Sequence, residues 1–331
     1  MPGVNGANGN HEHPFGVRTA GDACSGGVGP GLPTPPATNG HAFGVKSAEQ
    51  NADAQAGRVS HPHQSEPHRE SRQPVIVLKL GGSVLTGEAA IASAVEEVRG
   101  WVSRGYGVVA VVSAFEGETD RLLSLARSFG REAWATAALV ATGEHTSAAA
   151  LALALDAGGV SAATLDAAGI GLRTSAEALD ASPRDLDVEA LRTALSASRV
   201  VVVPGFVGRD ERLRTTLLGR GGSDLTALFI AGRLRARCRL VKDVPGLFER
   251  DPKVDEAARL YSRVSWDGAL ALDGGIVQQK GVRFAKEIGL EFEVGALGEE
   301  FATRVGGEVC EFAREGVRAS GLQAVREECA A

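Results

Sequence analysis

Several features that mark other classes of protein are scarce or absent in this chain. Its cysteines are few and far apart, with no C-x-x-C pair: Cys24, Cys238, Cys310 and Cys329. This spacing argues against a zinc site or a disulfide framework and fits a reducing compartment. No uninterrupted apolar run reaches the roughly 18 residues of a membrane span, and the N-terminus lacks the apolar core of a secretory signal. We therefore expect a cytoplasmic protein without a membrane partner.

An excess of positive charge is also absent. The 331 residues include 35 Lys and Arg against 41 Asp and Glu, a formal charge of −6. This mild acidity gives no reason to expect a nucleic-acid partner. The length allows one large domain or two small ones.

Residues 1–72 differ from the rest because they are rich in Gly, Pro, Asn, Ser and His and almost free of Leu and Ile. Such a segment buries too little apolar surface to fold, so we predict a disordered low-complexity tail. Its six histidines fit a solvated tail better than a metal site. Residues 13–20 and 41–48 resemble each other. This echo is either a chance duplication or a bivalent motif on which a partner protein docks.

From residue 74 onward, apolar runs alternate with helical patterns. Strands are predicted at residues 75–80, 108–112, 160–165, 200–204, 239–242 and 290–294, and helices at residues 88–104, 133–157 (with a break at Gly143), 185–197, 224–236 and 276–288. Repeated β-α-β units predict an α/β fold: a three-layer αβα sandwich with a mostly parallel central sheet. Ligands of such sheets bind beyond the carboxyl ends of the strands.

Two glycine-rich loops combine fixed charge with accessible backbone N–H groups. After the first strand, Lys79 precedes Gly81, Gly82 and Ser83, without the spacing of a Walker loop. A lysine near the end of a buried strand is costly unless it meets an anion. The second loop runs into a helix and holds a cation, three backbone donors and a carboxylate: Arg220, Gly221, Gly222, Ser223 and Asp224. Two such loops indicate two anionic ligands and a transfer reaction between them.

Three other segments allow a functional and a structural interpretation. Ser113 and Thr119 offer hydroxyl groups to a ligand, or Thr119 is a helix N-cap. Glu144, at the predicted helix break, binds a cation or only caps a helix, and the neighbouring His145 is more plausibly structural than catalytic. Residues 242–253 form a charged turn-rich loop, which either contacts a nucleotide or is a solvated surface loop.

Taken together and in this order, these segments resemble the amino acid kinase family, and within it the aspartokinase catalytic domain. The pattern is Lys-x-Gly-Gly-Ser, a Ser-Ala loop ending in Thr-Asp, Thr-Gly-Glu, Gly-Arg-Gly-Gly-Ser-Asp, and an Asp-Val-Pro-Gly segment ending in Asp-Pro. The segments that carry it are Lys79–Ser83, Ser113–Asp120, Thr142–Glu144, Gly219–Asp224 and Lys242–Lys253.

The resemblance implies ATP-dependent phosphorylation of the side-chain carboxylate of aspartate, giving an acyl phosphate. Lys79 and Asp224 would be catalytic, with Lys79 also on ATP. The implied substrate-binding residues are Ser113, Thr119, Glu144, Arg220, Gly221, Gly222 and Ser223. The implied ATP-binding residues are Gly81, Gly82, Ser83, Lys242, Asp243, Phe248 and Lys253. Mg²⁺ would be held mainly by the ATP phosphates, with no metal ligand from the chain. A homodimer is also expected, as is common in the family.

Some positions depart from the family pattern. Lys242 stands where threonine or serine is usual, Phe248 where tyrosine is usual, and Lys253 where arginine is usual. A family segment Gly-Ala-Lys-Val-Leu-His-Pro-Arg corresponds here to residues 274–281, so that Ile276 replaces a lysine on the nucleotide side. We expect a catalytic domain over residues 73–306 and a short extension over 307–331, too short for a regulatory domain that senses lysine or threonine. Two alternatives stay open: a kinase for another small amino acid or carboxylate, and a non-catalytic metabolite-binding homologue that partners another subunit.

Overall fold

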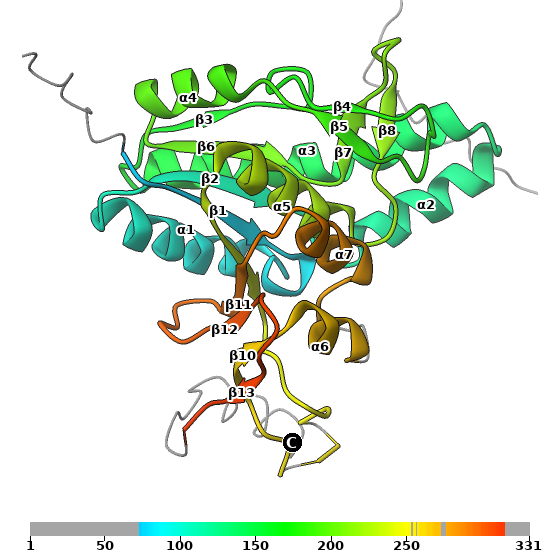
Figure 1. Ribbon diagram of the computed structural model, residues 1–331. Coiled ribbons are helices and arrows are strands. Elements are labelled where there is room, and N and C mark those ends of the chain that lie inside the picture. Colours follow the sequence, from blue (N-terminus) through cyan, green and yellow to red (C-terminus); the bar gives the residue numbers. More distant parts are fainter. Residues whose placement is uncertain (1–72, 253, 256, 273–275, 315–331) are drawn as a thin grey trace, which may run out of the picture. The chain divides into compact units, whose positions relative to one another are not determined.

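A computed structural model describes residues 73–252, 254–255, 257–272 and 276–314 of the chain, apart from the side chain of Glu88. The predicted tail over residues 1–72, and with it the docking motif, lies outside this range. Within it, a large sheet runs in the order β13-β10-β12-β11-β9-β1-β2-β6-β3, and a small one in the order β5-β4-β7-β8. The fold is α/β with a mostly parallel central sheet, as the sequence predicts (Figure 1).

The strands of the large sheet are β1 (Val75–Leu80), β2 (Gly107–Val112), β3 (Ala162–Thr164), β6 (Val200–Pro204), β9 (Arg237–Lys242), β10 (Tyr261–Val264), β11 (Phe292–Ala296), β12 (Thr303–Val305) and β13 (Glu311–Phe312). The small sheet contains β4 (Arg173–Thr174), β5 (Pro183–Asp185), β7 (Val207–Arg209) and β8 (Thr215–Leu217). The six neighbours from β11 to β3 all pair in parallel, whereas β12 and β13 add antiparallel pairs.

The helices are α1 (Glu88–Ser103), α2 (Glu118–Phe129), α3 (Ala133–Ala157), α4 (Val188–Ala197), α5 (Gly222–Leu234), α6 (Trp266–Ala271) and α7 (Gln279–Glu287), and a short 3-10 helix spans Gly82–Val84. Because side chains alternate across a strand, Ile76 and Leu78 pack with α1 and the C-terminal half of α3, whereas Val77 packs on the opposite face with α5. Helices therefore cover both faces of the sheet (Figure 1).

The N-terminal boundaries of two helices follow from capping. Glu132 accepts hydrogen bonds from the backbone N–H groups of Trp134 and Ala135 at the start of α3, and Asp187 accepts one from Ala190 at the start of α4. A carboxylate in these positions pairs with otherwise unsatisfied donors. These caps explain why the helices begin where they do.

Several predicted boundaries are wrong. The helix predicted from residue 185 begins only at Val188, because Asp185 belongs to β5. Helix α3 continues through Gly143 without a break, α5 begins at Gly222 rather than Asp224, and α7 begins at Gln279 rather than Ile276. Thr119 is not an N-cap, because Gly117 in the left-handed conformation holds that position. The small mixed sheet was not predicted, since its strands of two or three residues are too short to show a period.

The sequence analysis found no apolar run long enough for a membrane span. By length and composition, however, α3 is long and apolar enough to cross a membrane. This is weak evidence, because core helices of globular domains pass the same criterion. Ala137, Leu151 and Leu155 of α3 are fully buried in the hydrophobic core. The helix therefore packs as a central element of this fold.

Candidate active site

The strands that carry the predicted ligand loops end at one edge of the large sheet. In the parallel pairing, Leu80 at the end of β1 lies opposite Val112 of β2 and Val241 of β9. The loops that follow these paired strands therefore begin side by side. The structure thus brings the Lys79 loop, the Ser113 loop and the Lys242 loop to the same edge, where ligands of parallel sheets bind.

Helix α5 places its first turn over this edge. Gly205, just after β6, permits the approach, because a Cβ there would lie 2.9 Å from Ser223 Cβ and 2.9 Å from the carbonyl oxygen of Val112. Asp224 lies in the first turn of α5. Alternation along β1 and β9 turns Lys79 and Lys242 towards the face that α5 covers. Both lysines therefore point at the same carboxylate.

Lys79, Asp224 and Lys242 form a buried cluster. Lys79 Nζ lies 2.8 Å from Asp224 Oδ1, and Lys242 Nζ lies 3.0 Å from Oδ2. The exposed fractions of the three side chains are only 8%, 2% and 10%. Two ammonium groups share one carboxylate, so the cluster carries a net charge of +1. Burying an unbalanced charge is costly unless an anion approaches it.

The pKa values in this cluster follow from burial and charge. Burial alone would raise the pKa of Asp224, but the attraction of Lys79 and Lys242 outweighs it and lowers that pKa to about 2. Burial lowers the pKa of Lys242, and repulsion by Lys79 adds to this, while Asp224 opposes it. Asp224 is therefore ionised at neutral pH and holds both lysines in fixed positions.

The glycines of the loop that follows β1 lie close to Lys79 and to the Ser113 loop. A Cβ on Gly81 would lie 2.9 Å from Lys79 Nζ, so the ammonium group reaches across the backbone at this point. A Cβ on Gly82 would lie 3.4 Å from the carbonyl oxygen of Ala114, where the first loop contacts the Ser113 loop. Ser83 is exposed beside them. Backbone and ammonium group thus offer donors from one short segment.

Glu144 lies in the middle of α3, not at a helix start as predicted, and only 2% of it is exposed. Burial raises its pKa to about 7, although a hydrogen bond from the backbone N–H of Ala114 opposes the rise. Its Oε2 has no hydrogen-bond partner among the described residues. The neighbouring Ser147 donates to the carbonyl oxygen of Ser113 at 2.6 Å, which ties α3 to the Ser113 loop. A buried carboxylate with a free oxygen suits a cationic ligand.

The glycine loop before α5 brings only part of its predicted set together. Gly222 and Ser223 are buried in the first turn of α5, and Gly221 precedes them in a left-handed conformation with φ 76°. Arg220 is exposed and makes no ion pair within the described part of the chain. The structure thus joins Lys79 to Asp224 but leaves Arg220 at the surface, so its carboxylate-binding role stays a prediction.

The predicted nucleotide side is less well formed. Asp243 is exposed, whereas Phe248 is 7% exposed and its backbone pairs with Leu260. Little of the Phe248 ring is therefore open to a ligand. Lys253 lies outside the described residues. Lys242, predicted to contact ATP, has its ammonium group beside that of Lys79 instead of at the surface of its loop.

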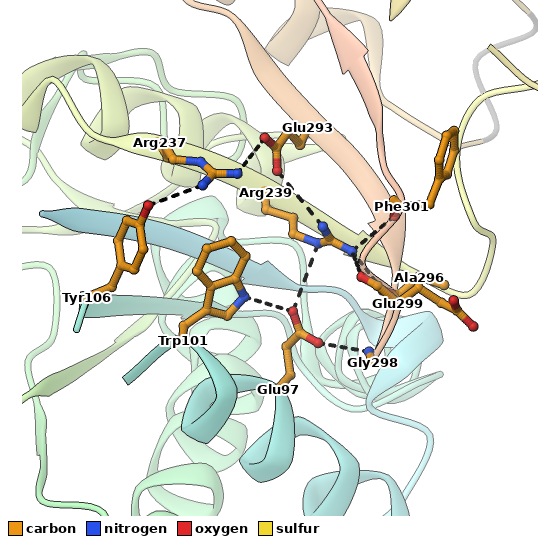
Figure 2. Close-up of polar contacts among 10 residues, drawn as sticks. All are labelled: Glu97, Trp101, Tyr106, Arg237, Arg239, Glu293, Ala296, Gly298, Glu299 and Phe301. Carbon is orange, nitrogen blue, oxygen red and sulfur yellow. Dashed lines mark hydrogen bonds and ion pairs between the residues drawn. The ribbon is translucent and has the colours of Figure 1, made fainter. Parts of the chain in front are cut away.

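A second polar network anchors β9 through Arg239 (Figure 2). Arg239 turns to the opposite face, with 3% of its side chain exposed, and its Nε lies 3.9 Å from Glu97 Oε1 of α1. Glu97 also accepts a hydrogen bond from the backbone N–H of Gly298 at 2.8 Å. The guanidinium donates to three carbonyl oxygens, those of Ala296, Glu299 and Phe301. The sequence analysis missed this network, whose signal is an arginine inside a buried strand.

The fold and the motifs agree with known proteins. The Amino acid kinase family matches residues 74–285. Aspartokinase of Helicobacter pylori (strain ATCC 700392 / 26695) is 34% identical over 223 residues, which are 66% of this chain and 55% of that protein. Aspartokinase 2 of Bacillus subtilis (strain 168) is 35% identical over 226 residues, with the same two shares of 66% and 55%.

Among solved structures, aspartate kinase from Synechocystis superposes with a TM-score of 0.62 and 29% sequence identity, over 71% of this chain and 40% of that one. The chain therefore spans about half the length of the curated relatives that it matches. The matched region includes every residue of the Lys79–Asp224–Lys242 cluster. On these grounds, the chain belongs to the amino acid kinase family.

Proposed function

We propose that the chain phosphorylates the side-chain carboxylate of aspartate with ATP, giving 4-phospho-aspartate, the first step towards amino acids such as lysine, threonine and methionine. The observation that carries the proposal is the buried Lys79–Asp224–Lys242 cluster with its net charge of +1. A transferring phosphoryl group is an anion that would balance this charge. The Helicobacter pylori and Bacillus subtilis relatives are named aspartokinases, which supports the choice of acceptor.

The cluster suits the chemistry of phosphoryl transfer. Negative charge spreads over the phosphoryl oxygens in the transition state, so catalysis depends on positioning and on fixed positive charge. Asp224 holds the ammonium groups of Lys79 and Lys242 against its two oxygens before substrate arrives. A carboxylate acceptor is already ionised near neutral pH, so the chain needs no strong general base to activate it.

On the acceptor side, Glu144 would bind the substrate ammonium group through its free Oε2. Arg220 would bind the substrate carboxylate, and its exposure leaves the guanidinium available for a bidentate pair. Ser113 and Thr119 would add hydroxyl groups. The backbone of Gly221, Gly222 and Ser223, at the start of α5, would favour the same negative charge.

On the nucleotide side, Gly81, Gly82 and Ser83 would cradle the phosphates beside Lys79. The position of Gly81 supports this, since a Cβ there would lie 2.9 Å from the ammonium group of Lys79 and take up space beside it. Asp243, Phe248 and Lys253 would contact the rest of ATP. The ATP phosphates would be the main ligands of Mg²⁺, and ATP supplies the phosphoryl group.

A panel assay tests the proposal. ADP release by the purified chain should depend on an added acid, with aspartate preferred among small amino acids and dicarboxylates. Lys79→Ala should lower kcat by about 10²–10³-fold, the effect of removing one transition-state donor. Its folding should be nearly normal, because Asp224 and Lys242 remain as a neutral pair.

Lys286→Ala, which removes an exposed lysine of α7, is the control and should keep full activity. Preference for another acid would support the first alternative, a kinase with a different acceptor. ATP or metabolite binding without turnover would support the second, a non-catalytic homologue that partners another subunit. A homodimer and a protein partner on the N-terminal tail stay predictions, which the mass of the complex in solution and a pull-down with residues 1–60 deleted would test.

A further inference from the structure

Lys280 occupies a position that ordinarily disfavours a cation. It lies in the first turn of α7, directly after the N-cap Gln278 and Gln279. The positive end of the helix dipole repels an ammonium group there. Three acceptors surround its Nζ: Asp180 Oδ1 at 2.7 Å, the carbonyl oxygen of Leu218 at 2.7 Å and that of Ala181 at 3.2 Å. The site is therefore built around this lysine despite the dipole.

The three acceptors come from two segments that meet at the small sheet. Asp180 and Ala181 lie between β4 and β5, and Leu218 directly follows β8. Backbone hydrogen bonds join the segments, since Ala181 N–H donates to the carbonyl oxygen of Leu217 and Leu217 N–H donates to that of Ala178, both at 2.8 Å. Lys280 connects this pair of segments to α7.

The loop that begins after Leu218 is confined on both sides. Gly219 and Gly221 have φ values of 72° and 76°. A Cβ on Gly219 would overlap the carboxylate of Asp180, and a Cβ on Gly221 would overlap the side chain of Gln278. The loop thus passes between Asp180, which pairs with Lys280, and Gln278, the N-cap of α7. It then enters α5, whose first turn carries Asp224.

We propose that Lys280 is a positioning residue. It holds the glycine loop 219–222 in place and thereby keeps Arg220 in position to bind the acceptor substrate. The inference rests on the proposed kinase function. None of the roles that the resemblance implies falls on Lys280. Its ammonium group does not join the Lys79 cluster among the described contacts. It contacts the residue that leads into the loop, Leu218, and Asp180 beside Gly219, rather than the reacting atoms.

Lys280→Met tests the tether, with Lys286→Met as the matched control. Lys286 lies on the same helix and also pairs with one aspartate, since its Nζ is 2.6 Å from Asp267 Oδ1. In the full chain, hydrogen exchange of the amides at residues 219–223 should speed up by at least about tenfold in Lys280→Met and by less than about twofold in the control. This measurement needs no activity.

Kinetics then test the functional consequence. In Lys280→Met, KM for the acceptor acid should rise about tenfold, while KM for ATP stays within about twofold and kcat within about threefold. Lys280→Arg keeps the charge and the donors, so its acceptor KM should stay within about threefold of the unchanged chain.

Two results would overturn the proposal. One is unchanged exchange at residues 219–223 in Lys280→Met. The other is faster exchange throughout α7 and the small sheet with equal losses in both KM values and kcat, which would mean a general structural role. A chain that phosphorylates no acid would refute the proposed kinase function instead, and the exchange measurement would still decide whether Lys280 holds the loop.

Discussion

Replacing Glu144 by Gln should stabilise the fold at high pH and weaken the binding of an amino-acid substrate. Glu144 is 2% exposed, and burial raises its pKa from 4.5 to about 7, against opposing backbone hydrogen bonds. Between these two values the folded chain binds more protons than the unfolded chain. Stability therefore falls as the pH rises from about 4.5 to about 7 and stays lower above that range.

The size of the effect follows from the two pKa values. With a pKa of about 7 in the folded chain and 4.5 in the unfolded chain, Glu144 lowers the free energy of unfolding by about 0.8 kcal/mol at pH 5 and about 3 kcal/mol at pH 8. Gln has nearly the same shape and does not ionise. The difference in unfolding free energy between Glu144→Gln and the unchanged chain should thus shift by about 2.5 kcal/mol between these pH values.

Urea unfolding at pH 5 and pH 8 measures this shift, because comparison at each pH cancels the titration of all other groups. Glu189→Gln, an exposed carboxyl on α4, is the control and should show no shift. In the kinase assay, the acceptor KM of the unchanged chain should decrease with rising pH as Glu144 ionises. Glu144→Gln should raise this KM and remove its dependence on pH. A stability difference that does not change with pH would refute the reasoning about burial.

Two further changes test the charged networks. Asp224→Asn leaves the ammonium groups of Lys79 and Lys242 buried without a counter-charge. The free energy of unfolding should therefore fall by about 3–5 kcal/mol at pH 7, and by less at pH 10, where lysine loses its proton more readily. Urea unfolding at both pH values measures the two losses, and equal losses would contradict this reasoning. Arg239→Leu leaves Glu97 buried without its cation, so the free energy of unfolding should fall by about 3 kcal/mol in the same assay. Adding Glu97→Gln in a double variant should restore part of this loss. A loss below about 1 kcal/mol would count against a structural role for the network in Figure 2.

Much of the fold could be predicted because the buried strands are visible in the sequence as continuous apolar runs. The runs at β1, β2 and β6 are apolar on both faces, which is typical of a parallel sheet with helices on each side. Lys79 could be singled out because a charge near the end of such a run requires an anion. These inferences need only local pattern and the cost of burial.

Other features depend on contacts that no local pattern reveals. Gly143 suggested a helix break, yet α3 continues through it, and a Cβ there would lie 3.1 Å from Ala114 Cβ and from Leu122 Cδ1. The glycine is a packing requirement rather than a helix end. Lys280 was missed for a similar reason, since its three acceptors come from the segment between β4 and β5 and from the residue after β8.

The sequence by itself determined the central strands, the side of the sheet that each of their residues faces, and the glycine loops at their ends, because these follow from apolar patterning and from the conformational freedom of glycine. Only the tertiary structure decided which charges meet. Lys79 and Lys242 share Asp224 because α5 packs against both β1 and β9, and Arg220, although four residues from Asp224, is left exposed by the same packing. The reason is physical: side chains that lie far apart along the chain become neighbours only when whole elements bury their apolar faces together.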